Sequence, residues 1–129
     1  MSLIDHLSVG VSDITEATRF YDATLAPLGS TRMATSDAFA AYGQGTIQFL
    51  AMKPNDGEAA GAGNGTHICF AAPSQEAVDA FHAAALSAGG QDEGKPGPRE
   101  AYPIPDVYAA FVRDPFGNKL EAIHNGFSG

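Results

Sequence analysis

Two histidines and one glutamate are the side chains of this sequence best suited to chemistry. His6 and His67 each stand at the start of a short apolar run, and Glu121 stands inside the last apolar run of the chain. Two neutral imidazoles and one carboxylate form the facial triad that binds a divalent transition metal and leaves coordination positions open. Such positions hold substrate oxygens, polarise a carbonyl or stabilise an enolate. The residue types therefore predict a metal site, provided that the fold brings them together.

An internal repeat is the reason to expect that they meet. The segment that contains His6 recurs around His67 at a constant shift along the chain, and matches continue in the same order beyond it. Self-similarity of this kind indicates a duplicated structural unit. The further matched pairs are Phe20 with Phe81, Ala23 with Ala84, Leu25 with Leu86, and Gly29 with Gly90.

The length of the chain indicates how the two copies are combined. A chain of 129 residues is the size of one ordinary domain, so the copies must share one core. We expect a single domain over residues 1–129. Its first module covers about 1–54, a glycine-rich connector covers 55–65, and its second module covers 66–126.

Hydrophobic periodicity predicts the same elements in each copy: a strand, a helix and about three strands. Asp13 is a helix N-cap with Glu16 as its capping partner. Residues 94–106, which are rich in proline, are expected to form a loop with little regular structure. The expected strands are 3–11, 31–35, 38–42, 46–52, 66–72, 107–113 and 119–124, and the expected helices follow Asp13 and Ser74.

These elements predict an α+β fold of two βαβββ modules. Each module forms a curved sheet with its helix on the outside, and the two sheets together form a half-open barrel. On the concave side, small residues accompany the histidines: Ser8 and Gly10 in the first module, Cys69 and Ala71 in the second. Small residues beside an imidazole leave the space that a ligand needs.

The last strands of the two modules also align. Matching Ile47-Gln48-Phe49-Leu50 with Leu120-Glu121-Ala122-Ile123 makes Gln48 the counterpart of Glu121. We expect Gln48 to bind substrate by a hydrogen bond or to act as a weaker fourth metal ligand.

Three further residues are candidates for substrate binding. Arg99 and Tyr102, in the proline-rich segment, could form a lid over an anionic or aromatic substrate, and Tyr108 could line the cleft. The alternatives are a solvated loop cation and a tyrosine that packs against a sheet.

Structural roles are the alternative for every candidate. A hydrogen-bonded core histidine is the ordinary explanation for His6 and for His67, and Glu121 could lie at an exposed sheet edge. Cys69 is expected to be a small buried hydrophobe. Of the two remaining histidines, His82 is expected on a helix surface. His124 is expected on the other face of its strand, in a structural role.

Composition limits the partners. The net charge of −8 argues against nucleic acid or an anionic membrane as partner. The single cysteine excludes an intrachain disulfide. No secretory signal or bilayer-spanning apolar run is visible, so we expect a cytoplasmic protein.

The duplicated plan, the histidine at the start of each module and the segment Asp-Pro-Phe-Gly-Asn-Lys-Leu-Glu that ends at Glu121 resemble the vicinal oxygen chelate superfamily. This group includes glyoxalase I, fosfomycin-resistance enzymes, bleomycin-resistance proteins and extradiol dioxygenases. The resemblance implies metal ligands at His6, His67 and Glu121, sometimes with a fourth from the position of Gln48. It also implies a homodimer, sometimes with ligands from both chains.

The resemblance leads to two functional hypotheses. The first is a glyoxalase-like enzyme that uses a divalent metal (zinc, manganese, nickel or iron) on a small oxygenated substrate, in a lyase, isomerase or transferase step. Glu121 would be its catalytic base if it leaves the metal. The alternative is a metal-free protein of the bleomycin-resistance type that sequesters a small aromatic or antibiotic-like ligand.

Overall fold

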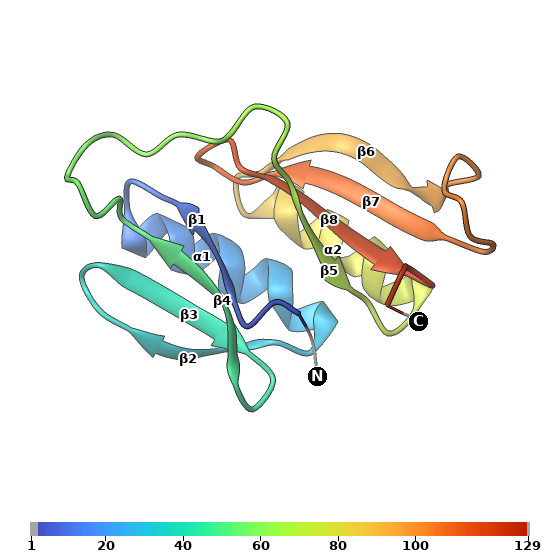
Figure 1. Cartoon of the computed structure of the whole chain (residues 1–129), viewed down its shortest axis with the longest axis horizontal. Coiled ribbons are helices and arrows are strands. Elements are labelled where there is room, and N and C mark those ends of the chain that lie inside the picture. The colour runs from blue at the N-terminus through green and yellow to red at the C-terminus, as the bar shows by residue number, and fades with distance from the viewer. Residues whose placement is uncertain (1–2, 129) are drawn as a thin grey trace.

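The computed structural model describes residues 3–128 as an α+β fold of two four-stranded sheets and two α-helices (Figure 1). The first module runs β1 (Leu7–Gly10), α1 (Ile14–Leu25), a 3₁₀ turn η1 (Ala26–Leu28), β2 (Thr31–Thr35), β3 (Phe39–Gly43) and β4 (Ile47–Met52). The second runs β5 (Ile68–Ala71), α2 (Gln75–Ser87), β6 (Gln91–Pro98), β7 (Tyr108–Arg113) and β8 (Lys119–His124).

The two sheets share one topology. Their strand orders are β1-β4-β3-β2 and β5-β8-β7-β6. In each sheet the first and last strands of the module pair in parallel, and the other neighbours are antiparallel. Figure 1 shows the sheets next to each other with both helices behind them. The predicted pair of βαβββ modules is confirmed, and the sheets do not close into a barrel.

Equivalent caps start the two helices. The Asp13 side chain accepts a hydrogen bond from the Glu16 backbone N–H at 2.8 Å, and Ser74 Oγ accepts one from the Ala77 N–H at 3.0 Å. Each bond satisfies an amide that the first helical turn leaves without a partner. The predicted N-cap at Asp13 is confirmed.

One hydrophobic core joins the modules. Both helices bury their apolar sides against their own sheets and against each other, with Phe20 and Phe81 fully buried. Phe49 of β4 meets Phe70 of β5 edge-to-face, with ring centroids 5.2 Å apart. Because neither module encloses this contact alone, burial of apolar area stabilises their association.

A buried hydrogen-bond network also ties the β7–β8 turn to the first module. Asp114 accepts the Tyr21 hydroxyl of α1 at 2.5 Å and the Asn118 side-chain amide at 2.8 Å. The same amide donates to the Gly10 carbonyl of β1 at 2.8 Å. Asp114 is 3% exposed, so these partners replace the water that it loses on folding. The turn that precedes Glu121 is thereby fixed to both modules.

One predicted element is wrong. Residues 94–98 were expected in a loop, but they belong to β6, which forms the outer strand of the second sheet. Its register with β7 shifts twice, between Asp92 and Gly94 and between Gly94 and Gly97. An outer strand tolerates proline because only one of its edges must donate to a neighbour, so Pro96 and Pro98 do not prevent pairing.

The segment between the modules carries no helix or strand from residue 53 to residue 67. Within residues 3–128, neither helix has the length and apolar character that crossing a bilayer requires.

Candidate functional site

The face of the second sheet that points away from α2 holds the candidate site. β5 and β8 lie side by side in parallel, with Cys69 opposite Glu121. Ile68 and Phe70 point into the core, so alternation directs His67 and Cys69 to the opposite face, away from α2. Glu121 shares that face because its neighbour Leu120 is buried in the core.

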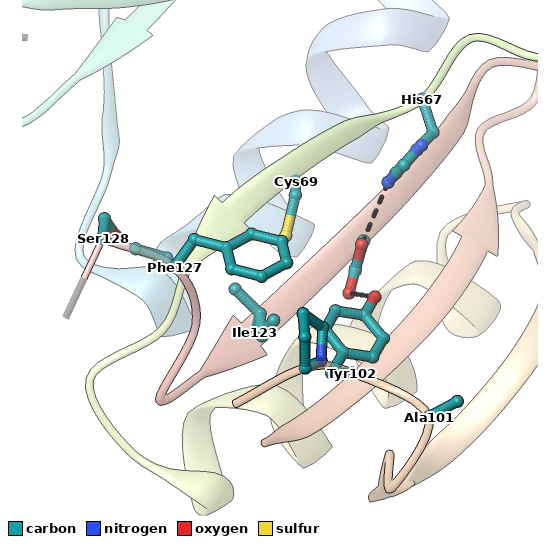
Figure 2. Close-up of a pocket in the computed structure, with 10 residues that line it drawn as sticks. His67, Cys69, Ala101, Tyr102, Ile123, Phe127 and Ser128 are labelled. Atoms are coloured by element: carbon teal, nitrogen blue, oxygen red, sulfur yellow. Dashed lines mark hydrogen bonds and ion pairs between the residues drawn. The ribbon is translucent and has the colours of Figure 1, made fainter. Parts of the chain in front are cut away.

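The Glu121 carboxylate is held by both of its oxygens. His67 Nε2 lies 3.0 Å from Oε1, and the Tyr102 hydroxyl donates to Oε2 at 2.5 Å (Figure 2). Glu121 is only 2% exposed, which excludes the alternative of an exposed sheet edge. A buried carboxylate is costly unless it is paired, and these two contacts supply the pairing.

A cavity of about 730 Å³ opens above this network. Its volume falls within the range of small-molecule sites. The polar groups His67, Tyr102 and Glu121 lie at one place on its wall, and much of the remainder is apolar. The full lining is His67, Cys69, Ala71, Ala101, Tyr102, Pro103, Glu121, Ile123, Phe127 and Ser128.

Burial and the Glu121 charge keep two neighbouring groups protonated. Burial raises the pKa of the Tyr102 hydroxyl, and the hydrogen bond to Glu121 raises it further. Partial loss of hydration at the cavity wall raises the pKa of the Cys69 thiol although the residue is exposed to the cavity, and the charge of Glu121 raises it further. Tyr102 is therefore a hydrogen-bond donor at neutral pH, and Cys69 is a neutral thiol, a form that is a poor nucleophile. Contrary to the expectation of a buried residue, Cys69 is exposed on the cavity wall.

His6 lies apart from this network. Its Nδ1 is 2.7 Å from Asp5 Oδ1 near the start of β1, and its side chain is 57% exposed. It lines a second cavity, of about 430 Å³, which shares Cys69 and Ala71 with the first. Across residues 3–128, no three His, Cys, Asp or Glu side chains are grouped closely enough to hold one metal ion. A single chain therefore brings His67 and Glu121 together without His6.

The strand register shows that the counterpart of Glu121 in the first module is Leu50 and not Gln48. Ser8 of β1 lies opposite Leu50, as Cys69 of β5 lies opposite Glu121. Since Ser8 and Cys69 are equivalent under the repeat, Leu50 occupies the position that corresponds to Glu121. The proposed equivalence of Gln48 was thus offset by two residues. An offset of two preserves the face, and Gln48 lines the second cavity with His6.

Arg99 and Tyr108 lie outside the cavity. The Arg99 guanidinium donates to the carbonyls of Lys95, Gly97 and Pro98, and its Cζ lies 5.7 Å from the centroid of the Phe111 ring. It thereby fixes the end of β6. The Tyr108 hydroxyl donates to Asp79 of α2 at 2.7 Å, on the helix-covered face of the sheet.

The two remaining histidines make structural contacts. His82 was expected on a helix surface, but it is largely buried, and its Nε2 lies 2.8 Å from Asp92 Oδ1 of β6. This hydrogen bond lowers the pKa of Asp92. His124 Nδ1 lies 3.2 Å from the Ala72 carbonyl.

The sequence did not indicate one cavity residue, Phe127. It follows the last strand, where no periodic pattern places it, yet its ring stacks on that of Tyr102 with centroids 5.9 Å apart. An aromatic residue near the chain end, after a strand that carries a candidate ligand, was the only available signal.

Comparison with known proteins identifies the family. Residues 3–122 match the model of the Glyoxalase/Bleomycin resistance protein/Dioxygenase superfamily. The chain belongs to this superfamily. Its members include a glyoxalase/bleomycin resistance protein from Albidiferax ferrireducens T118, whose crystal structure is 38% identical in sequence. That comparison covers 97% of this chain and all of the other, with a TM-score of 0.88.

More distant solved structures share the superfamily fold. A glyoxalase-related enzyme from Fulvimarina pelagi is 16% identical over 97% of this chain and 89% of its own, with a TM-score of 0.74. A glyoxalase/bleomycin resistance protein/dioxygenase family enzyme from Burkholderia phytofirmans PsJN is 18% identical over 93% and 96%, with a TM-score of 0.69. Among curated proteins, none matches the chain.

Proposed function

We propose that this chain is a glyoxalase-like enzyme that uses a divalent metal to act on a small oxygenated substrate. The observation that carries the proposal is the pair of donors His67 Nε2 and Glu121 Oε1, 3.0 Å apart on the wall of a cavity of about 730 Å³. A neutral imidazole and a carboxylate are two of the three ligands of a facial triad. The reaction class is a lyase, isomerase or transferase step.

The donor set of one chain tests whether a metal fits. The potential metal ligands His67 and Glu121 lie next to each other, but the third, His6, is paired with Asp5 elsewhere. The set becomes complete if His6 of a second copy of the chain reaches His67 and Glu121. His6 precedes β1 as His67 precedes β5, so an arrangement that places the first module of one copy against the second module of another would supply a matching imidazole.

Exposed apolar side chains support a homodimer of this kind. Met33, Ile47 and Met52, all in the first sheet, are 36–41% exposed. Burial of such exposed apolar side chains against another protein is favourable, so these three residues are candidates for a subunit contact. We propose that a second copy covers this sheet, and that the whole chain, residues 1–129, acts as one domain of that homodimer. A cytoplasmic location remains a prediction.

The residues around the cavity have separate roles in this proposal. A bound metal would hold substrate oxygens and stabilise negative charge that develops on them. Glu121 would accept a proton when it is free of the metal, as a carboxylate near a substrate can. Tyr102, which stays protonated, would orient Glu121 or donate to a substrate oxygen. The apolar walls would exclude water.

A second candidate function follows from the same cavity. Within residues 3–128, one chain supplies two converging ligands, and most of the cavity wall is apolar. These features favour a metal-free protein that sequesters a small apolar ligand, as in the alternative drawn from the sequence.

Metal analysis of protein purified without a polyhistidine tag separates the two candidates. The enzyme proposal predicts stoichiometric metal in the wild type, with loss of that metal in His67→Ala and in Glu121→Gln. His124→Gln is the matched control, because His124 lies on the same sheet outside the cavity, and it should retain the metal. A wild type that stays free of metal after incubation with zinc, manganese, nickel and iron, and that binds an apolar dye tightly, would favour sequestration.

A further inference from the structure

The C-terminal segment forms one wall of the cavity. After β8, Asn125 adopts a left-handed conformation with φ 61°, and its side-chain amide donates to the Asp106 carbonyl at 3.0 Å. This turn brings Phe127 against the loop that carries Tyr102. The two rings stack with centroids 5.9 Å apart and planes 24° from parallel (Figure 2).

Phe127 is exposed although it packs against Tyr102. It is 73% exposed, and it lines the same cavity as Glu121. An exposed aromatic ring beside Ile123 and Pro103 presents apolar area that water solvates poorly. The small side chains Ala71 and Ala101 also line this cavity. This part of the cavity has the character of a site for an apolar group.

The other part of the cavity wall is polar. Tyr102 belongs to both parts, because its ring stacks on Phe127 while its hydroxyl donates to Glu121. A ligand that fills the cavity therefore meets hydrogen-bonding groups at one end and an aromatic face at the other. The cavity volume of about 730 Å³ accommodates a molecule that spans both parts.

We infer that the ligand of this cavity is a molecule of two parts: a planar apolar group that packs against Phe127, and an oxygen-bearing end held at His67 and Glu121. The inference rests on the proposed function only in that the cavity binds a small molecule. It narrows the small oxygenated substrate to compounds such as aryl ketones, aryl diols and phenols, and it assigns Phe127 as the residue that selects them.

Matched neutral probes test this assignment. 2-Hydroxyacetophenone and hydroxyacetone carry the same adjacent carbonyl and hydroxyl oxygens and differ in a phenyl group against a methyl group. Their dissociation constants are measured by calorimetry with the full chain, as wild type, Phe127→Ala and Phe127→Leu. Aromatic pairs contribute about 1 kcal/mol, so the phenyl preference of the wild type should fall roughly fivefold in Phe127→Ala. Phe127→Leu keeps the apolar contact without the ring, so its phenyl preference should lie between those of the wild type and Phe127→Ala.

Several results would overturn the inference. A phenyl preference that is equal in the wild type and Phe127→Ala would remove Phe127 from ligand selection. Absence of any phenyl preference in the wild type would show that the ligand needs no apolar group. A change of oligomeric state in Phe127→Ala, seen by light scattering, would assign Phe127 to a subunit contact instead. The metal content of each variant is measured in parallel. Absence of metal would count against the proposed enzyme function, whereas the phenyl preference alone tests the role of Phe127.

Discussion

The Tyr102 hydroxyl donates to Oε2 of Glu121 at 2.5 Å, and this bond leaves Oε1 directed at His67. A carboxylate held at one oxygen presents the other in a defined orientation, as groups behind metal ligands commonly do. Tyr102 comes from the irregular segment after β6, so the position of that segment determines how Glu121 is presented.

Removal of this hydroxyl should weaken metal binding without disturbing the fold. Tyr102→Phe keeps the ring that stacks on Phe127 but loses the donor to Glu121. Loss of a partner behind a metal ligand typically lowers metal affinity about 10-fold or more. Competition with a chromophoric chelator measures the change. Metal affinity equal to that of the wild type would show that Tyr102 does not position Glu121.

The tyrosines predict a distinctive alkaline titration. All four donate to an acidic side chain: Tyr21 to Asp114, Tyr42 to Asp22, Tyr102 to Glu121 and Tyr108 to Asp79. The pKa of every one is raised, chiefly by burial for the first three and by the hydrogen bond to Asp79 for Tyr108. A tyrosine in water titrates near pH 10, at about its ordinary pKa.

The sign of the effect on stability follows from these raised pKa values. The contribution is fully present below about pH 10 and is lost as the pH rises above it, because the unfolded chain releases the protons first. Ultraviolet titration should show less tyrosinate at pH 10 than four tyrosines in water would give, and the buried tyrosines should ionise cooperatively as the protein unfolds. Ionisation of all four tyrosines near pH 10 while the far-ultraviolet circular dichroism stays native would contradict this prediction.

The turn before Glu121 predicts the largest loss of stability. Asp114 accepts from the Tyr21 hydroxyl, the Asn118 side chain and the backbone amides of Phe116 and Asn118. Asp114→Ala leaves these donors without their acceptor, which should lower the free energy of unfolding by about 3 kcal/mol. Tyr21→Phe removes one bond and should cost about 1 kcal/mol. Urea unfolding followed by circular dichroism measures both changes, and equal values for the two variants would contradict the assignment of Asp114 as the centre of the network.

The module plan could be predicted from the sequence because it depends on local signals. The cap at Asp13 lies within a few residues of chain, and the repeat around His6 and His67 shows that the same order of local elements recurs. β6 could not be predicted, since proline and glycine normally interrupt strands. Its pairing depends on its place at the edge of the sheet, where β7 is its one neighbour.

The candidate site could be predicted only in part, for a related reason. His67 and Glu121 meet because β5 pairs with β8, and alternation along these two strands was sufficient to place both on one face. The counterpart of Glu121 required the β1–β4 register, which side-chain patterns do not show, so Gln48 was chosen in place of Leu50. Phe127 depends on a turn at Asn125 whose direction is set by tertiary contacts.

The metal content of a mixed dimer tests most directly whether His67 and Glu121 of one copy share a metal with His6 of another. His6→Ala and His67→Ala chains, each with a removable tag of its own, are unfolded together, refolded and purified as the mixed species. A shared site predicts little metal in either variant alone and one restored site in the mixed dimer, because one pairing of the two chains keeps every ligand. A mixed dimer as free of metal as its parents, or a His6→Ala protein that binds metal like the wild type, would contradict it.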